Sequence, residues 1–285
     1  MMPRPKLIVI DKDALIGIGL HSLCDFAKSH LLVLSDTLLY ECATATKQDA
    51  KGLLRRFQTL IEMGARFCQS SIGLLQKEAE SCEPYPLTLV DSDATNKIGN
   101  ELASLEAMVD SEILEIVVQS RNEVAQFELV ERSQQLKEAI DREHPGTVAV
   151  SKAYQGNRSD RLKEFLAAVA KMNVHDLAVA LLPSDLIGGS RRFCLSPDWI
   201  AWQYVRLVIA MMYDHHYIRQ TGAPRDDHAE HDRNDLDYVL LLSRADGIIT
   251  KDKGLIELAR AAFPEKDVFS SLEEVSESYR CDWAQ

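Results

Sequence analysis

Acidic residues stand beside short apolar runs at both ends of this 285-residue chain. Asp11 directly follows the run at residues 7–10, and Asp252 comes two residues after the run at residues 247–250. Glu41 lies early in the helix-like segment that follows a third run. Mg²⁺ and Mn²⁺ prefer oxygen ligands, and three or four convergent carboxylates suit them. Such an ion can orient a water, lower its pKa and neutralise charge on a phosphate under attack. These residues therefore indicate metal-dependent hydrolysis of phosphodiesters.

A further ligand is expected at one of two aspartates, Asp235 and Asp237, at the start of a helix-like segment that ends near residue 244. Side chains two residues apart on a helix point about 200° away from each other, because each residue advances the helix by roughly 100°. One aspartate would therefore face the ion, and the other would cap or solvate the helix end. Asp235 is favoured, because its distance from Thr250 fits the expected helix length better.

The elements that must position these acids follow an α/β pattern. Continuous apolar runs rich in β-branched residues are typical of strands buried on both faces of a parallel sheet. Such runs occupy residues 7–10, 31–34 and 247–250, with a possible last strand at residues 267–269. Helix-like segments follow the first two runs, which favours an α/β fold with a central parallel sheet. If their strands are neighbours, Asp11 and Asp252 belong at the sheet edge where such folds bind ligands.

The middle of the chain differs, because a helical period of apolar residues dominates from about residue 49 to residue 222. Expected helices cover residues 162–172, 177–182 and 197–217. Residues 87–90 form either a short strand or the start of a helix. The economical division is a discontinuous α/β domain of residues 1–48 and 228–285, interrupted by a large all-helical insertion at residues 49–227.

Composition and charge narrow the function classes. A hydrophobic content of 46% is enough for a sizeable core. The formal net charge of −12 argues against a broad, non-specific nucleic-acid-binding surface. It leaves open a nucleic-acid enzyme whose carboxylates need a bound cation before phosphate can approach. The six cysteines include no CxxC pair and are expected to be reduced thiols. Without a signal peptide or an apolar stretch of about 18 residues, a cytoplasmic protein with no membrane span is expected.

Two stretches of the chain resemble PIN-domain nucleases. The C-terminal stretch, residues 234–253, carries both aspartates of the helix start and the sequence Thr250-Lys251-Asp252. The N-terminal stretch is residues 7–11, followed by Glu41 in the second strand–helix unit. The order Asp, Glu, Asp, Asp is that of the family's acidic quartet. The resemblance implies a three-layer PIN-like fold and a Mg²⁺- or Mn²⁺-dependent ribonuclease that acts on RNA.

The resemblance also implies roles for individual residues. It assigns catalysis and metal binding to Asp11, Glu41, Asp235 (or Asp237) and Asp252. Thr250 would hold the Asp252 loop, as in the family's Thr-x-Asp motif. The chain departs from the family in the length of its insertion, and in Lys12 and Asp13, where a small hydroxyl or amide residue is common.

Two alternatives remain open. Residues 7–13 also resemble the nucleophile strand of haloacid-dehalogenase-like phosphatases, in which the first aspartate attacks phosphate and the second is the acid/base. Ala14 and Leu15 depart from that pattern, however, and a phosphatase has no need for Glu41. The second alternative is a catalytically inactive PIN-like scaffold whose helical insertion, for example residues 100–143, binds a protein partner or forms a homodimer.

Three further clusters have an ordinary structural interpretation beside a functional one. Histidines and aspartates between residues 214 and 232 can bind a transition metal or position substrate, but a charged loop is favoured. Trp199 and Trp202 can stack on bases, but packing of an apolar helix is favoured. Basic residues can contact a nucleic-acid backbone, although surface charge of this density is common. These basic residues are Lys152, Arg158, Arg161, Arg191 and Arg192.

Overall fold

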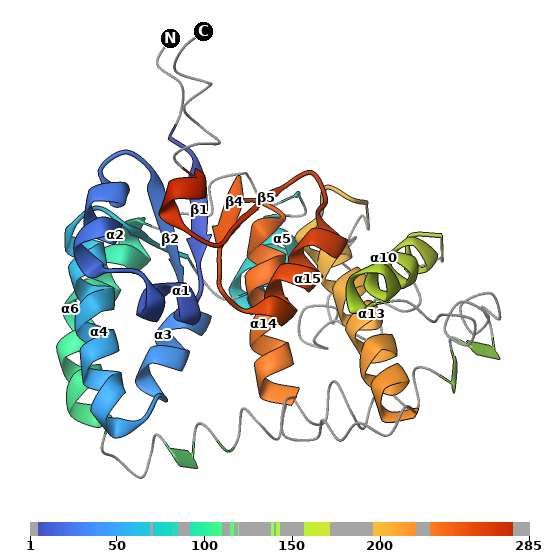
Figure 1. Ribbon diagram of the computed structural model, residues 1–285, viewed down its shortest axis with the longest axis horizontal. Coiled ribbons are helices and arrows are strands. Elements are labelled where there is room, and N and C mark those ends of the chain that lie inside the picture. Colours follow the sequence, from blue (N-terminus) through green and yellow to red (C-terminus); the bar gives the residue numbers. More distant parts are fainter. Residues whose placement is uncertain are drawn as a thin grey trace, which may run out of the picture.

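The computed structural model describes residues 5–68, 71–81, 83–84, 92–109, 157–171, 196–220 and 229–275, and a few residues between 115 and 142. These residues form an α/β structure around a five-stranded sheet in which all strands are parallel (Figure 1). The strands are β1 (Leu7–Ile10), β2 (Leu31–Ser35), β3 (Arg66–Cys68), β4 (Gly247–Ile249) and β5 (Asp267–Phe269). Their order is β3-β2-β1-β4-β5, which is consistent with a three-layer α/β fold.

The four strands expected from the apolar runs are confirmed to within one residue at their ends. The two central strands, β1 and β4, are buried along their whole length, as a parallel sheet covered on both faces requires. They are direct neighbours, with Val9 beside Ile248. The condition for bringing Asp11 and Asp252 to the same edge is therefore met.

The sheet also extends into residues that were expected to be helical. β3 lies beside β2, with Phe67 paired to Leu34, so the prediction of an all-helical insertion from residue 49 onward is wrong at this strand. β3 begins with the charged Arg66 and so shows no continuous apolar run, and it closely follows the long, strongly periodic helix α4 (Lys47–Glu62). The sequence feature that could have indicated a new element here is Gly64, which marks the end of that helix.

One group of helices gathers beside β2 and β3 (Figure 1). Its members are α1 (Lys12–Gly17), α2 (Leu20–Ala27), α3 (Asp36–Ala43), α4 and α6 (Ser92–Met108). α4 contacts α2, α3 and α6, and α6 contacts β3. The periodic apolar residues of α4, among them Leu54 and Phe57, are buried, as their spacing predicted.

A second group consists of α5 (Ser71–Ser81), α10 (Arg158–Val169), α13 (Ile200–Gln220), α14 (Ala229–Leu242) and α15 (Lys253–Ala262). α10 packs against α13 and α15, and α14 packs against α13, α15 and β1 (Figure 1). α10 and α13 correspond to the helices expected at residues 162–172 and 197–217, whereas residues 87–90 and 177–182 lie outside the described residues. Apolar side chains of α10 and α13 belong to the same core as the strands. These two helices are therefore integral to the body that carries the sheet.

None of the helices in the described ranges combines the length and apolar character needed to cross a membrane. Cys24, Cys42 and Cys68 are buried thiols. The other three cysteines lie outside the described residues.

The connections from β1 create a switch point in the sheet. The chain leaves β1 toward β2 and β3 on one side, whereas β4 and β5 lie on the other side. Open parallel sheets bind ligands outside the carboxyl ends of the strands at such a point. Here those ends carry Asp11 and Thr250, and the Asp11 N–H donates a hydrogen bond to the Ile249 carbonyl at 3.4 Å. The fold therefore brings the two ends of the sequence together where a site is expected.

Gly64 provides a test of the end of α4. Its φ is +106°, and the N–H groups of Gly64 and Ala65 donate to the Ile61 and Leu60 carbonyls at 3.1 and 2.9 Å, the paired hydrogen bonds of a Schellman motif. Gly64→Ala should destabilise the fold by about 1 kcal/mol, because an alanine is strained at positive φ. Chemical denaturation measures this change.

Gly99→Ala is the matched control, because Gly99 lies within α6 and an added Cβ would meet Ile61 at an ordinary 3.7 Å. It should leave the free energy of unfolding unchanged or raise it. Equal losses in the two variants would contradict this account of the helix end.

Candidate metal centre

The Thr250 hydroxyl joins the two aspartates that follow the central strands. It donates a hydrogen bond to Oδ2 of Asp11 and accepts one from the Asp252 N–H at 3.0 Å. Thr250 is fully buried and Asp11 is 3% exposed, so water does not compete for these bonds. The hydroxyl therefore fixes both aspartates at the carboxyl edge of β1 and β4.

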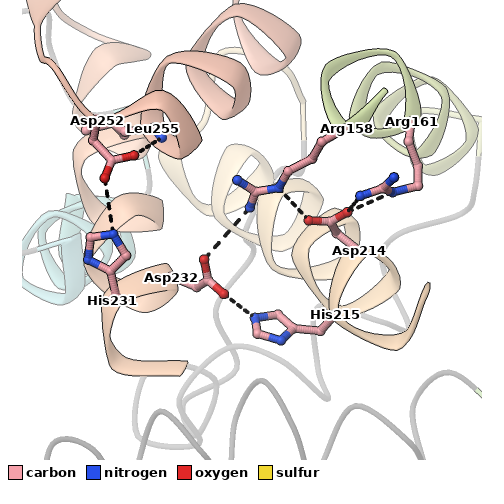
Figure 2. Close-up of polar contacts among 8 residues, drawn as sticks. All are labelled: Arg158, Arg161, Asp214, His215, His231, Asp232, Asp252 and Leu255. Carbon is pink, nitrogen blue, oxygen red and sulfur yellow. Dashed lines mark hydrogen bonds and ion pairs between the residues drawn. The ribbon is translucent and has the colours of Figure 1, made fainter. Parts of the chain in front are cut away.

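Each of these aspartates also caps a helix. Oδ1 of Asp11 accepts from the Ala14 N–H at 2.8 Å, and Oδ1 of Asp252 accepts from the Leu255 N–H at 2.9 Å. Capping a helix and contributing to a site are compatible roles, because one carboxylate oxygen of each aspartate caps the helix N-terminus and the other contacts a different group. Oδ2 of Asp252 lies 3.3 Å from Nε2 of His231 (Figure 2).

Asp235 and His231 lie one turn apart on α14 and face Asp252. One ligand atom from each of these three residues can be chosen so that all lie within 4.8 Å of one another, a spacing that could hold a metal ion. Asp235 is 4% exposed, and none of the residues that the structure describes donates a hydrogen bond to its carboxylate. The carboxylate is therefore buried and directed toward the site without a fixed donor.

Asp237 lies on another face of the same helix. Its carboxylate accepts hydrogen bonds from Thr37 Oγ1 at 3.1 Å, from Ser71 Oγ at 2.5 Å and from the Arg233 guanidinium. These contacts join α14 to α3 and α5, so Asp237 has a structural role in the fold. Of the two aspartates that the sequence left open, the structure places Asp235 beside Asp252, as the roughly 200° separation along a helix requires.

Glu41 completes the acidic group from α3. Its carboxylate accepts a hydrogen bond from the Tyr238 hydroxyl at 2.6 Å and a longer one from Asn234 Nδ2 at 3.4 Å. Nζ of Lys12 lies 3.8 Å from Glu41 Oε1. Glu41 is 7% exposed and close enough to Asp11 for its charge to raise the pKa of that carboxyl. The Tyr238 hydroxyl and the Asn234 amide, both on α14, therefore orient the Glu41 carboxylate.

The charges of this site are incompletely balanced. Burial raises the pKa of Asp11 to about 7, although the Thr250 hydrogen bond opposes this effect. Burial also holds the pKa of Asp235 well above its usual value, against the attraction of His231. The hydrogen bond between His231 and Asp252 raises the pKa of His231 to about 9 and lowers that of Asp252 to about 2. The imidazolium therefore compensates Asp252, while Asp11 and Asp235 are short of positive charge.

The two arginines of α10 are buried in an ion-pair network instead of forming an exposed patch. The Arg158 and Arg161 guanidinium groups each donate to Asp214 at 2.8 Å, and their side chains are 12% and 7% exposed (Figure 2). Asp232 lies 3.8 Å from Arg158 and 2.7 Å from Nε2 of His215. The possible role of these two arginines in gripping a nucleic-acid backbone is therefore corrected to a structural one. Lys152, Arg191 and Arg192 lie outside the described residues.

Gly254 allows this network to approach the acids. A Cβ at this position would lie 2.9 Å from Nη1 of Arg158 and 3.1 Å from Oδ1 of Asp252. Asp235 Oδ2 lies 3.7 Å from the same point. Arg158, from a helix assigned to the insertion, therefore borders the acidic group and was not predicted to do so.

His231 belongs to the histidine- and aspartate-rich stretch for which a charged loop was favoured, whereas the structure places it in α14 beside the acids. The available signal is its spacing, because residues at i and i+4 share a face of a helix and His231 stands four residues before Asp235. Trp199 and Trp202 lie in or beside the core, and Arg206 stacks on Trp202 with its guanidinium 5.1 Å from the ring centroid. Apolar packing of this helix is thus confirmed.

Asp13, the second aspartate of the phosphatase interpretation, is exposed in the first turn of α1. The chain matches no family model, and searches of curated proteins and of solved structures find no match.

The raised pKa of Asp11 predicts how the stability of the metal-free protein depends on pH. An aspartate in the unfolded chain has a pKa of about 3.9, so the buried Asp11 binds its proton more tightly when folded. Its contribution to stability is fully present below about pH 4 and is lost as the pH rises through about 7. Asp11→Asn removes this loss. With a chelator present, the free energy of unfolding of the variant, relative to that of the wild type, should rise by more than about 1 kcal/mol from about pH 5 to about pH 8.

Chemical denaturation at the two pH values measures the difference, and Asp13→Asn, at an exposed position, is the matched control. The same pH dependence in wild type and Asp11→Asn would show that Asp11 does not titrate in this range.

Proposed function

We propose that this chain is a PIN-like, Mg²⁺- or Mn²⁺-dependent nuclease that hydrolyses phosphodiester bonds of RNA. The observation that carries the proposal is the convergence of acids from four segments at the switch point of the sheet. Asp11 follows β1, Glu41 lies in α3, Asp235 lies in α14 and Asp252 caps α15. Their order along the chain, and the Thr250-Lys251-Asp252 sequence, agree with the resemblance to PIN-domain nucleases.

The side chains at this edge fit a hard divalent cation. A charged carboxylate is unfavourable where burial removes it from water, and burial raises the pKa of both Asp11 and Asp235. A cation would relieve this cost. When bound, Mg²⁺ or Mn²⁺ would supply a polarised water for attack on phosphorus and positive charge for the phosphate. His231 would have to release its proton to bind the ion, and its neutral imidazole would favour Mn²⁺ of the two, because Mg²⁺ prefers oxygen ligands.

The chain's own residues would divide the remaining work. Asp235, Asp252 and His231 would hold the ion from α14 and the start of α15, and Asp11 and Glu41 would offer further oxygens. Thr250 would keep Asp11 and Asp252 fixed through its two hydrogen bonds. Preorganised groups of this kind accelerate hydrolysis, because they need not reorient as charge develops.

The alternatives predict other requirements. A scaffold that binds a protein partner through its helices would keep the same fold without needing the acids. A phosphatase of the haloacid-dehalogenase kind would need Asp11 as its nucleophile and Asp13 as its acid/base, and it would have no need for Glu41. The pattern of activity among variants of Asp11, Asp13, Asp235 and Asp252 therefore separates the nuclease, the scaffold and the phosphatase.

RNA cleavage in Mn²⁺ by variants of the acids tests the proposal. Asp11→Asn combined with Asp252→Asn should reduce the cleavage rate by on the order of 100-fold or more, because the cation loses two of its ligands. Asp235→Asn should have a similar effect. Asp13→Asn is the matched control, and it should retain the wild-type rate to within about twofold. Single-turnover cleavage of several unrelated RNAs measures these rates.

A wild type that cleaves none of the RNAs, or a double variant as active as the wild type, would overturn the nuclease and leave the scaffold. Loss of activity in Asp13→Asn, measured on a phosphomonoester, would favour the phosphatase instead.

A further inference from the structure

A pocket of about 640 Å³ opens beside the acidic group. Its walls come from α1, from the connection between α3 and α4, and from the first half of α4. The volume falls in the range of about 300–1,000 Å³ that is typical of small-molecule sites. Lys12 lines the pocket and also lies 3.8 Å from Glu41, so the pocket adjoins the candidate metal centre.

Two cations line this pocket. Lys12 is one-third exposed. Arg56 donates a hydrogen bond to the Ile18 carbonyl, but its buried Nε has no partner, and no carboxylate among the described residues forms an ion pair with it. An arginine without a counter-ion and a partly exposed lysine can together receive an anionic group such as a phosphate.

Apolar side chains cover another part of the wall. Ile16 is 51% exposed, although it is a large hydrophobic residue, and Leu53 lines the pocket from α4. The exposed Asp49 also lines the pocket and accepts a hydrogen bond from Thr46 Oγ1 at 2.5 Å. The pocket thus offers cations, an apolar surface and a hydrogen-bond acceptor, which match the phosphate, ring face and polar edge of a nucleotide.

Gly52 keeps part of this pocket open. It lies inside α4 with no left-handed φ, and a Cβ added there would meet no atom within 4 Å. Glycine weakens the interior of a helix. Neither a special backbone conformation nor close packing therefore requires a glycine at position 52. A larger side chain at this position would project into the pocket.

We propose that this pocket binds one nucleotide of a single-stranded RNA next to the bond that is cleaved. The phosphate would contact Lys12 and Arg56, and the base would lie against Ile16 and Leu53 with its edge toward Asp49. A base enters such a pocket only from an unpaired strand. The inference rests on the proposed nuclease function, because Lys12 then places the neighbouring phosphodiester beside Glu41.

Calorimetric titration with each of the four nucleoside 5′-monophosphates, in a chelator and without divalent ions, tests the pocket. At least one of them should bind the wild type at least about tenfold more tightly than inorganic phosphate does. Gly52→Leu and Gly52→Gln should each weaken that binding by about tenfold or more, because their side chains fill the pocket. Gln58→Leu, on the same helix but outside the pocket, is the matched control and should bind as the wild type does.

Absence of binding to the wild type at about 10 mM nucleotide would overturn the proposal. So would unchanged binding by folded Gly52→Leu and Gly52→Gln, or equal affinity for phosphate and nucleotide. Nucleotide binding by a wild type that cleaves no RNA would support the pocket and contradict the nuclease. Cleavage of RNA by a wild type that binds no nucleotide would support the nuclease and contradict the pocket.

Discussion

The hydroxyl of Thr250 accepts the Asp252 N–H and donates to Asp11, and so connects side chains from opposite ends of the chain. The acidic group depends on this bridge, because it fixes the Asp11 side chain to the Asp252 loop beyond the paired strands β1 and β4. A buried carboxylate is stabilised by fixed donors, yet burial still raises the pKa of Asp11 to about 7. The metal-free protein therefore holds an acidic site whose charge is incompletely compensated, and a cation would complete it.

Helix α14 distributes its polar residues according to the helical period. His231 and Asp235 face Asp252, and Asn234 and Tyr238 face Glu41. Asp237 binds Thr37 and Ser71, and Arg233 donates to Asp237. Each pair is four residues apart, so each occupies its own side of the helix. One helix thereby supplies two candidate ligands, contacts α3 and α5, and orients the glutamate. The same spacing explains why two neighbouring aspartates have separate roles.

Much of this arrangement could be predicted from the sequence. Continuous apolar runs revealed β1, β2, β4 and β5, and the acids that follow them indicated one edge of the sheet. β3 was missed because it begins with Arg66 and closely follows the periodic helix α4, although Gly64 marks the helix end before it. The burial of Arg158 and Arg161 was not predictable, because their partner Asp214 is more than 50 residues away in sequence. Pairing at such distances is decided by packing, in this case of α10 on α13.

Anomalous diffraction from crystals soaked in Mn²⁺ tests the central claim most directly, because it locates the ion without relying on turnover. The account predicts a peak at coordination distance from Asp235 and Asp252, on the side of the site that faces Asp11 and Glu41, and none at Asp237. A protein that shows no peak at these acids at saturating Mn²⁺, or an ion held only at Asp237, would contradict it.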